Sequence, residues 1–151
     1  MRVWAIELAW WLVAALFALL MVLPILQYNI PYPFLITHIT YVAGFVLYLK
    51  LLFLWKKSPY SKYQWLKLIL IFAMIPVVFF SIEALANFQN YLDEIGIQEM
   101  VKDLDESLQD GMALYIRTQM IFFGTACIIC GIVLAPKMIW SIWTQHNRGY
   151  A

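Results

Sequence analysis

Residues 8–49 form one continuous stretch without a single Asp, Glu, Lys or Arg. One bilayer crossing needs about 20 apolar residues in a helix, so this stretch has room for two crossings and the turn between them. The whole chain is 64% hydrophobic and 13% charged, whereas a soluble domain carries about 25% charged residues. The sequence therefore predicts a single integral membrane domain over residues 1–151. A net charge of +1 gives no indication of nucleic-acid binding.

Turn signals divide the apolar sequence into separate helices. Pro31 and Pro33 end the first apolar run, because proline cannot continue a helix, and a basic segment over 56–63 ends the second. Pro76 should kink the third helix, and Pro136 follows the fourth. We expect an all-α, four-transmembrane-helix bundle with spans at about 3–26, 34–55, 64–87 and 112–135.

The basic residues predict the orientation of this bundle. Lysine and arginine accumulate on the cytoplasmic side of membrane proteins. Only Lys102 and Arg117 fall on one side of the predicted bundle. The other side carries the remaining basic residues, namely Arg2, Lys50, Lys56, Lys57, Lys62, Lys67, Lys137 and Arg148. We expect both termini in the cytoplasm, in a bacterial cytoplasmic (inner) membrane or, as the alternative, an organellar inner membrane.

The connection between the third and fourth spans, about residues 88–111, is acidic and faces outward in this topology. Apolar residues recur within it at helical spacing, at Ile97, Met100, Val101, Leu104 and Leu108. This pattern predicts a short amphipathic helix. The helix would either cover the ends of the spans or offer a docking surface to an external partner.

Four polar residues near the outer ends of the predicted spans form a candidate site, namely His38, Tyr41, Glu83 and Arg117. With the expected helix ends, the three ionisable groups lie about 6–8 Å below the outer boundary at 1.5 Å per residue. Ionisable groups inside membranes usually face the bundle and pair. Glu83 and Arg117 should then form an ion pair. This cluster would bind a quinone head group, a lipid head group or a proton, or would only fix the helix register.

Two further patterns predict helix contacts. A stripe of small residues on the fourth span should let a neighbouring helix approach closely, and Arg117 should share its face. The stripe consists of Gly124, Cys127, Gly131 and Ala135. At the inner face, Glu7 and Lys50 lie on hairpin neighbours and should form a salt bridge, with a role for Glu7 in a proton relay as the alternative.

The remaining motifs predict little chemistry. Cys127 and Cys130 form a C-x-x-C pattern, but they lie near the middle of an apolar span, where thiolates are disfavoured; we expect packing residues. His38 and His146 fall on opposite sides of the bundle, so a bis-histidine haem site is not expected. We predict no metal site, no catalytic residues and no cofactor, with a bound quinone or lipid as the alternative.

Three functions compete on this basis. The first is a non-catalytic subunit that stabilises, assembles or regulates a larger membrane protein complex, with other membrane subunits and lipid as partners. The short loops favour it, because they leave no soluble domain for catalysis. The second is a quinol-binding or redox component that uses the His38 cluster. The third is a small proton-conducting or transport unit that works as an oligomer.

Overall fold

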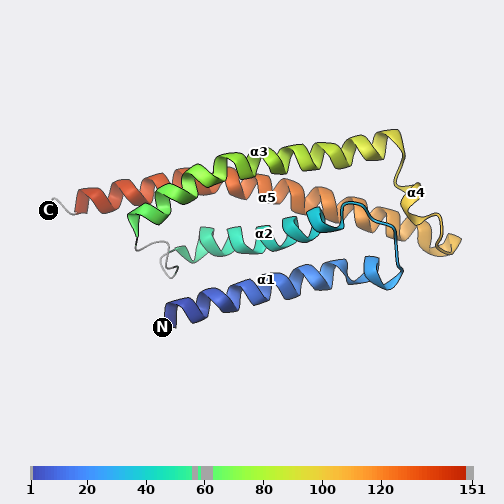
Figure 1. Cartoon of the computed structure of the whole chain (residues 1–151), viewed down its shortest axis with the longest axis horizontal. Helices are drawn as coiled ribbons and strands as arrows, with labels where there is room; N and C mark the ends of the chain where they lie inside the picture. The colour runs from blue at the N-terminus through green and yellow to red at the C-terminus, as the bar shows by residue number, and fades with distance from the viewer. Residues whose placement is uncertain (1, 56–57, 59–62, 149–151) are drawn as a thin grey trace.

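A computed structural model describes residues 2–55, 58 and 63–148, and the side chains of residues 4–55, 58 and 63–147. Within these residues five helices follow one another (Figure 1): α1 (Arg2–Gln27), α2 (Leu35–Phe53), α3 (Gln64–Glu94), α4 (Gln98–Val101) and α5 (Glu106–Arg148). Helices α1, α2, α3 and α5 are long and apolar enough to cross a membrane. The prediction of an all-helical chain with four candidate spans is confirmed.

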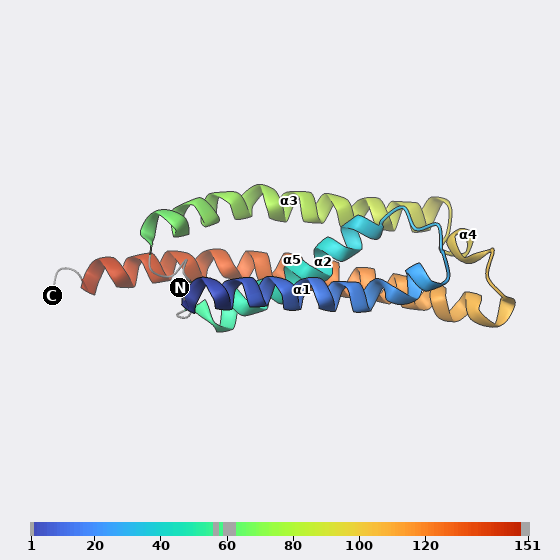
Figure 2. The same ribbon diagram turned by 60° about the horizontal axis from the view of Figure 1, so that its bottom comes forward.

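Among the four long helices, α2 packs against both α1 and α5, and α3 packs against α5. Tyr115 of α5 also donates a hydrogen bond to the Met21 carbonyl of α1. Figures 1 and 2 show both chain ends at one end of the bundle and α4 at the other. We call these the termini end and the α4 end. Because the chain reverses direction three times, α2 and α5 run parallel to each other and antiparallel to α1 and α3.

Two helices are longer than the spans expected from the sequence. α3 continues to Glu94, and α5 begins at Glu106 and runs through Pro136 to Arg148. Its 43 residues give a length of about 65 Å, against about 30 Å for the hydrocarbon core. Leu134 and Met138, both 0% exposed, flank Pro136 and pack with Trp55 and Met74. This packing stabilises α5 across the proline, which removes one backbone hydrogen bond and crowds the carbonyl four residues earlier.

The α4 segment covers the ends of the long helices. Met100 and Val101 are buried in the main hydrophobic cluster, together with Val22 and Ile25 of α1. α4 itself has four residues, so the apolar positions from Ile97 to Leu108 are shared between α4, its flanking turns and the start of α5. On its exposed side Lys102 forms a salt bridge with Glu99. The hydrogen bond from Lys102 to Glu99 raises the pKa of the lysine.

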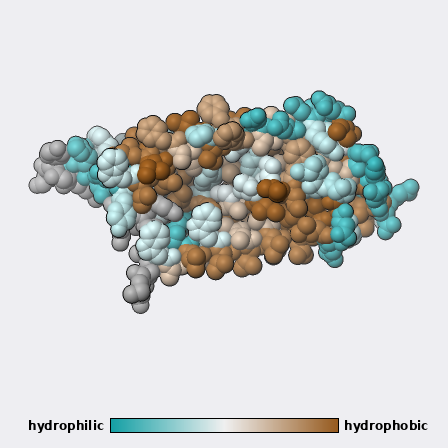
Figure 3. Space-filling model, in the orientation of Figure 1, coloured by the Kyte–Doolittle hydropathy of each residue, from teal (hydrophilic) through white to brown (hydrophobic). Residues whose placement is uncertain are grey.

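The outer surface of the bundle is apolar along most of its length. Figure 3 shows hydrophobic side chains over the middle of the molecule and hydrophilic ones gathered at the α4 end. Leu16 and Leu20 of α1, for example, are 65% and 64% exposed. Such a surface suits hydrocarbon or a protein neighbour rather than water.

Candidate functional site

Glu7 of α1 and Lys50 of α2 form a salt bridge inside the bundle, near the termini end. Their side chains are 8% and 3% exposed, respectively. The pair lies where the sequence pattern expects it, because the two residues face each other across the α1–α2 hairpin. The salt bridge with Lys50 is enough to explain why the Glu7 carboxylate is buried. The bridge joins the hairpin at the end opposite its turn.

The small-residue stripe on α5 lies at the junction of three helices. A Cβ atom on Gly124 would stand 2.9 Å from Leu85 of α3 and 3.1 Å from Tyr41 of α2, and one on Gly131 would stand 2.9 Å from Val78 of α3. These distances are shorter than van der Waals contact, so α3 and α5 approach closely only because both positions lack a side chain. Cys127 is buried in the same stripe, whereas Ala135 is half-buried.

Tyr41 connects α2 to α3 across this junction. Its hydroxyl donates a hydrogen bond of 2.5 Å to the backbone carbonyl of Ser81. Cys127 packs against α2 as well, because a Cβ atom on Gly44 would lie 3.1 Å from its Sγ atom. Both Cys127 and Cys130 are free thiols. In residues 2–55, 58 and 63–148, no group of three His, Cys, Asp or Glu side chains is arranged to hold a metal ion.

Glu83 and Arg117 do not form the expected ion pair. Both side chains are exposed, and neither has an ion-pair partner in the part of the chain that the structure describes. The contacts of Gly124 with Leu85 and of Gly131 with Val78 set residue 83 of α3 level with residue 126 of α5. Arg117 is nine residues away from that level, which is about 13.5 Å along the helix. The two charges therefore lie at different depths, not at one.

The same register places Glu83 near the middle of the bundle and Arg117 near its edge. Tyr41 lies beside Gly124, and Gly44 beside Cys127. Residue 126 is therefore level with residue 43, midway along α2, and Arg117 is level with residue 34, just before α2 begins. Arg117 is exposed, although Gly124, seven residues further along a similar face of α5, is buried. The expectation that Arg117 points into the protein is wrong.

His38 lies inside the bundle, whereas the side chains of Glu83 and Arg117 are exposed. It is 0% exposed, and neither ring nitrogen has a hydrogen-bond partner among the described residues. The ring of Tyr32 meets the imidazole edge-on, with 5.9 Å between the ring centroids. The Tyr32 hydroxyl is buried without a partner as well, and this burial raises its pKa. The four residues of the predicted cluster therefore do not share one site.

A polar cluster that the sequence reasoning missed lies at the termini end. Lys67 of α3 is 1% exposed, and its ammonium donates hydrogen bonds to Ser141 Oγ at 3.0 Å and Gln145 Oε1 at 2.7 Å. Trp55 donates to the same Ser141 Oγ at 3.0 Å. Both acceptors belong to the part of α5 beyond Pro136. The available signal was the spacing of four residues between Ser141 and Gln145, which puts them on one helical face.

Comparison with protein-family models, with curated proteins and with solved structures gives no match to this chain.

Proposed function

We propose that this chain is a non-catalytic integral membrane subunit that stabilises, assembles or regulates a larger membrane protein complex. The observation that carries the proposal is the position of Glu83. Its carboxylate is exposed on the outside of α3, level with the middle of α2. On insertion scales, an acidic residue at the centre of a membrane helix costs about 2.5–3.5 kcal/mol. A cationic side chain on a neighbouring membrane protein would offset that cost.

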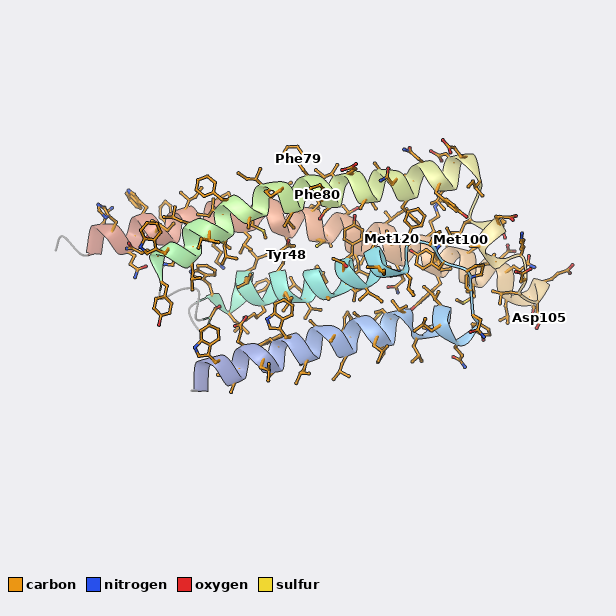
Figure 4. All side chains as sticks on the ribbon, viewed as in Figure 1. Tyr48, Phe79, Phe80, Met100, Asp105 and Met120 are labelled. Carbon is orange, nitrogen blue, oxygen red and sulfur yellow. The ribbon has the colours of Figure 1, made fainter. Side chains whose placement is uncertain are left out.

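The surface around Glu83 has the features of a helix-packing interface. Exposed residues follow one another along α3 at intervals of three or four, which places them on one face. We call this face the α3 outer stripe: Trp65, Ile69, Phe72, Pro76, Phe79, Glu83, Asn87, Asn90 and Glu94. Phe72 and Phe79 are both 69% exposed, and Figure 4 shows Phe79 pointing away from the other helices. Large aromatic side chains are enriched at protein interfaces.

A second copy of the same chain fits this stripe poorly. Among the residues that the structure describes, the lysines and arginines away from the termini end are Lys102 and Arg117. Arg117 lies about 13.5 Å from the level of Glu83 along the helix axis, and Lys102 lies beyond it at the α4 end. In two copies inserted in the same orientation, Glu83 of one copy and Arg117 of the other would still lie at different depths in the membrane. We therefore propose a different protein as the partner, with a lysine or arginine near the bilayer midplane.

The proposed orientation places both termini in the cytoplasm, in a bacterial cytoplasmic membrane. Its support is the distribution of charge along the sequence, because eight of the ten basic residues lie at position 2, within 50–67 or within 137–148. Seven of the nine acidic residues lie between 93 and 110, toward the α4 end. The acidic α4 segment would then close the bundle on the outer side.

The position of Glu83 also favours one other function, a proton-conducting unit. A carboxylate near the midplane can bind and release a proton if water or a neighbour reaches it. This function needs an oligomer and a second polar path, and the offset between Glu83 and Arg117 argues against self-association through these two charges. A redox site built on His38, Tyr41, Glu83 and Arg117 has no comparable support, because His38 and Tyr41 are buried on α2 whereas Glu83 and Arg117 are exposed and lie at different depths.

The test is purification from native membranes in a mild detergent. The wild-type chain and Glu94→Gln, a matched control on the same stripe at the α4 end, should retain one defined partner protein. Glu83→Gln should lose that partner, because it leaves the partner's cation without a counter-ion. Migration of the wild-type chain as a lone 17.7 kDa species, or equal retention by Glu83→Gln, would overturn the proposal. Proton flux in liposomes that falls on Glu83→Gln would favour the proton-conducting unit instead.

A further inference from the structure

A shallow groove runs along the outward face of α5, away from the α3 outer stripe. Its volume is about 580 Å³. The lining residues are Leu114, Arg117, Thr118, Ile121, Phe122, Thr125, Ala126 and Ile129. The walls are thus apolar apart from the hydroxyls of Thr118 and Thr125 and the guanidinium of Arg117. Because Arg117 lies near one end of this set, the groove has a charged end and an apolar body.

Measured along the axis of α5, the groove is about as long as one bilayer leaflet is thick. Arg117 is level with residue 34, at the boundary of the α2 span, and Ile129 lies twelve residues further along α5. That distance is about 18 Å, close to the roughly 15 Å thickness of half a hydrocarbon core. Long side chains on a helix point back toward its N-terminus, so the Arg117 guanidinium can reach the head-group layer at the α4 end.

The charge pattern at this end selects the head group. Arginine binds phosphate through two parallel hydrogen bonds, and Arg117 is exposed without a carboxylate partner among the described residues. Asp110 lies two turns before Arg117 on the same face and is exposed as well. Gln98 is its hydrogen-bond partner, at 3.4 Å. A head group with a phosphate alone would meet the acidic α4 segment unfavourably. A phosphate with a primary ammonium complements both charges and, unlike a quaternary nitrogen, can donate hydrogen bonds to the Asp110 carboxylate.

We propose that this groove binds one phosphatidylethanolamine molecule of the leaflet at the α4 end. Its phosphate contacts Arg117, its ammonium faces Asp110, and one acyl chain lies along Leu114, Ile121 and Ile129. The site involves no residue of the α3 outer stripe, so it stands independently of the partner proposed for Glu83.

The test is native mass spectrometry of the full chain, released from nanodiscs that contain equal amounts of phosphatidylethanolamine, phosphatidylcholine and phosphatidylglycerol. Wild type should retain one phosphatidylethanolamine at least tenfold over either competitor. Arg117→Gln should reduce retention about tenfold, and Asp110→Asn should abolish the preference over phosphatidylglycerol. Lys102→Gln removes a basic residue at the same end but outside the groove, and should bind as wild type does.

A second variant separates the acyl chain from the head group. Ile121→Trp fills the groove without changing a charge, and it should also reduce retention about tenfold while the circular dichroism spectrum stays helical. The proposal is overturned if the three lipids are retained equally by wild type, or if Arg117→Gln and Ile121→Trp both retain phosphatidylethanolamine as wild type does. A protein, rather than lipid, photo-crosslinked at position 121 in native membranes would also overturn it.

Discussion

Removing Lys50 should leave the Glu7 carboxylate buried without its counter-ion. In the folded protein Glu7 is 6% exposed, and Lys50 is its hydrogen-bond partner within the described residues. Breaking a buried ion pair from one side typically costs about 3–5 kcal/mol. We therefore expect Lys50→Met to lower the free energy of unfolding by about 3–5 kcal/mol.

Replacing both partners gives the opposite expectation. Glu7→Leu combined with Lys50→Met leaves no charge inside the hairpin, and apolar replacements of buried pairs are often neutral or stabilising. The double variant should therefore unfold within about 1 kcal/mol of wild type. The assay is reversible unfolding with sodium dodecyl sulfate in detergent micelles, followed by circular dichroism. Lys137→Met, a half-buried lysine on α5 near the same end, is the control for losing a lysine.

Two outcomes would refute this reasoning. If Lys50→Met unfolds as wild type does, water or another group already stabilises Glu7, and the salt bridge contributes little. If the double variant is as unstable as Lys50→Met, the loss comes from packing around residue 50 rather than from a stranded charge.

Three further predictions follow from the packing. Gly124→Val should destabilise the protein by about 1–3 kcal/mol in the same unfolding assay, because its Cβ would meet Leu85 and Tyr41; Gly111→Ala, with open space around it, should be neutral or stabilise by up to about 1 kcal/mol. Burial raises the pKa of Tyr32 above 10, so the unfolded chain releases this proton first and stability should fall as pH rises above about 10. Tyr32→Phe should remove up to about 1.4 kcal/mol per pH unit of that slope, and an unchanged slope would contradict it. Cys127 should resist a hydrophilic maleimide until the protein is unfolded, and mass spectrometry showing label on the folded chain would disprove its burial.

The sequence was sufficient for the number of spans, because hydrocarbon requires long apolar helices and the turn signals separate them. It also predicted local contacts that depend on spacing alone. Gly124 and Gly131 lie on one helical face, and both contact α3. Glu7 and Lys50 face each other because the hairpin between them is short.

The depth of a side chain in the bundle could not be predicted in the same way, because it depends on the residues at which the helices begin and end. Residues 88–94 contain Gln89, Asn90, Asp93 and Glu94 and resemble a loop, yet α3 continues through them because Phe88 is buried in the main cluster. That extension moves Glu83 from the predicted boundary to the middle of the bundle. The Lys67 cluster was missed for a related reason, because Pro136 suggested a helix end and its two acceptors lie beyond it.

The depth of residue 83 tests the central claim most directly. A single cysteine at position 83, in a Cys127→Ala and Cys130→Ala background, can carry a nitroxide spin label in reconstituted bilayers. Accessibility to oxygen and to a water-soluble nickel complex then reports depth, with labels at positions 65 and 94 for comparison. We predict that the label at 83 has the highest oxygen and lowest nickel accessibility of the three. A label at 83 that is as accessible to nickel as the label at 94 would contradict a carboxylate in the middle of the membrane.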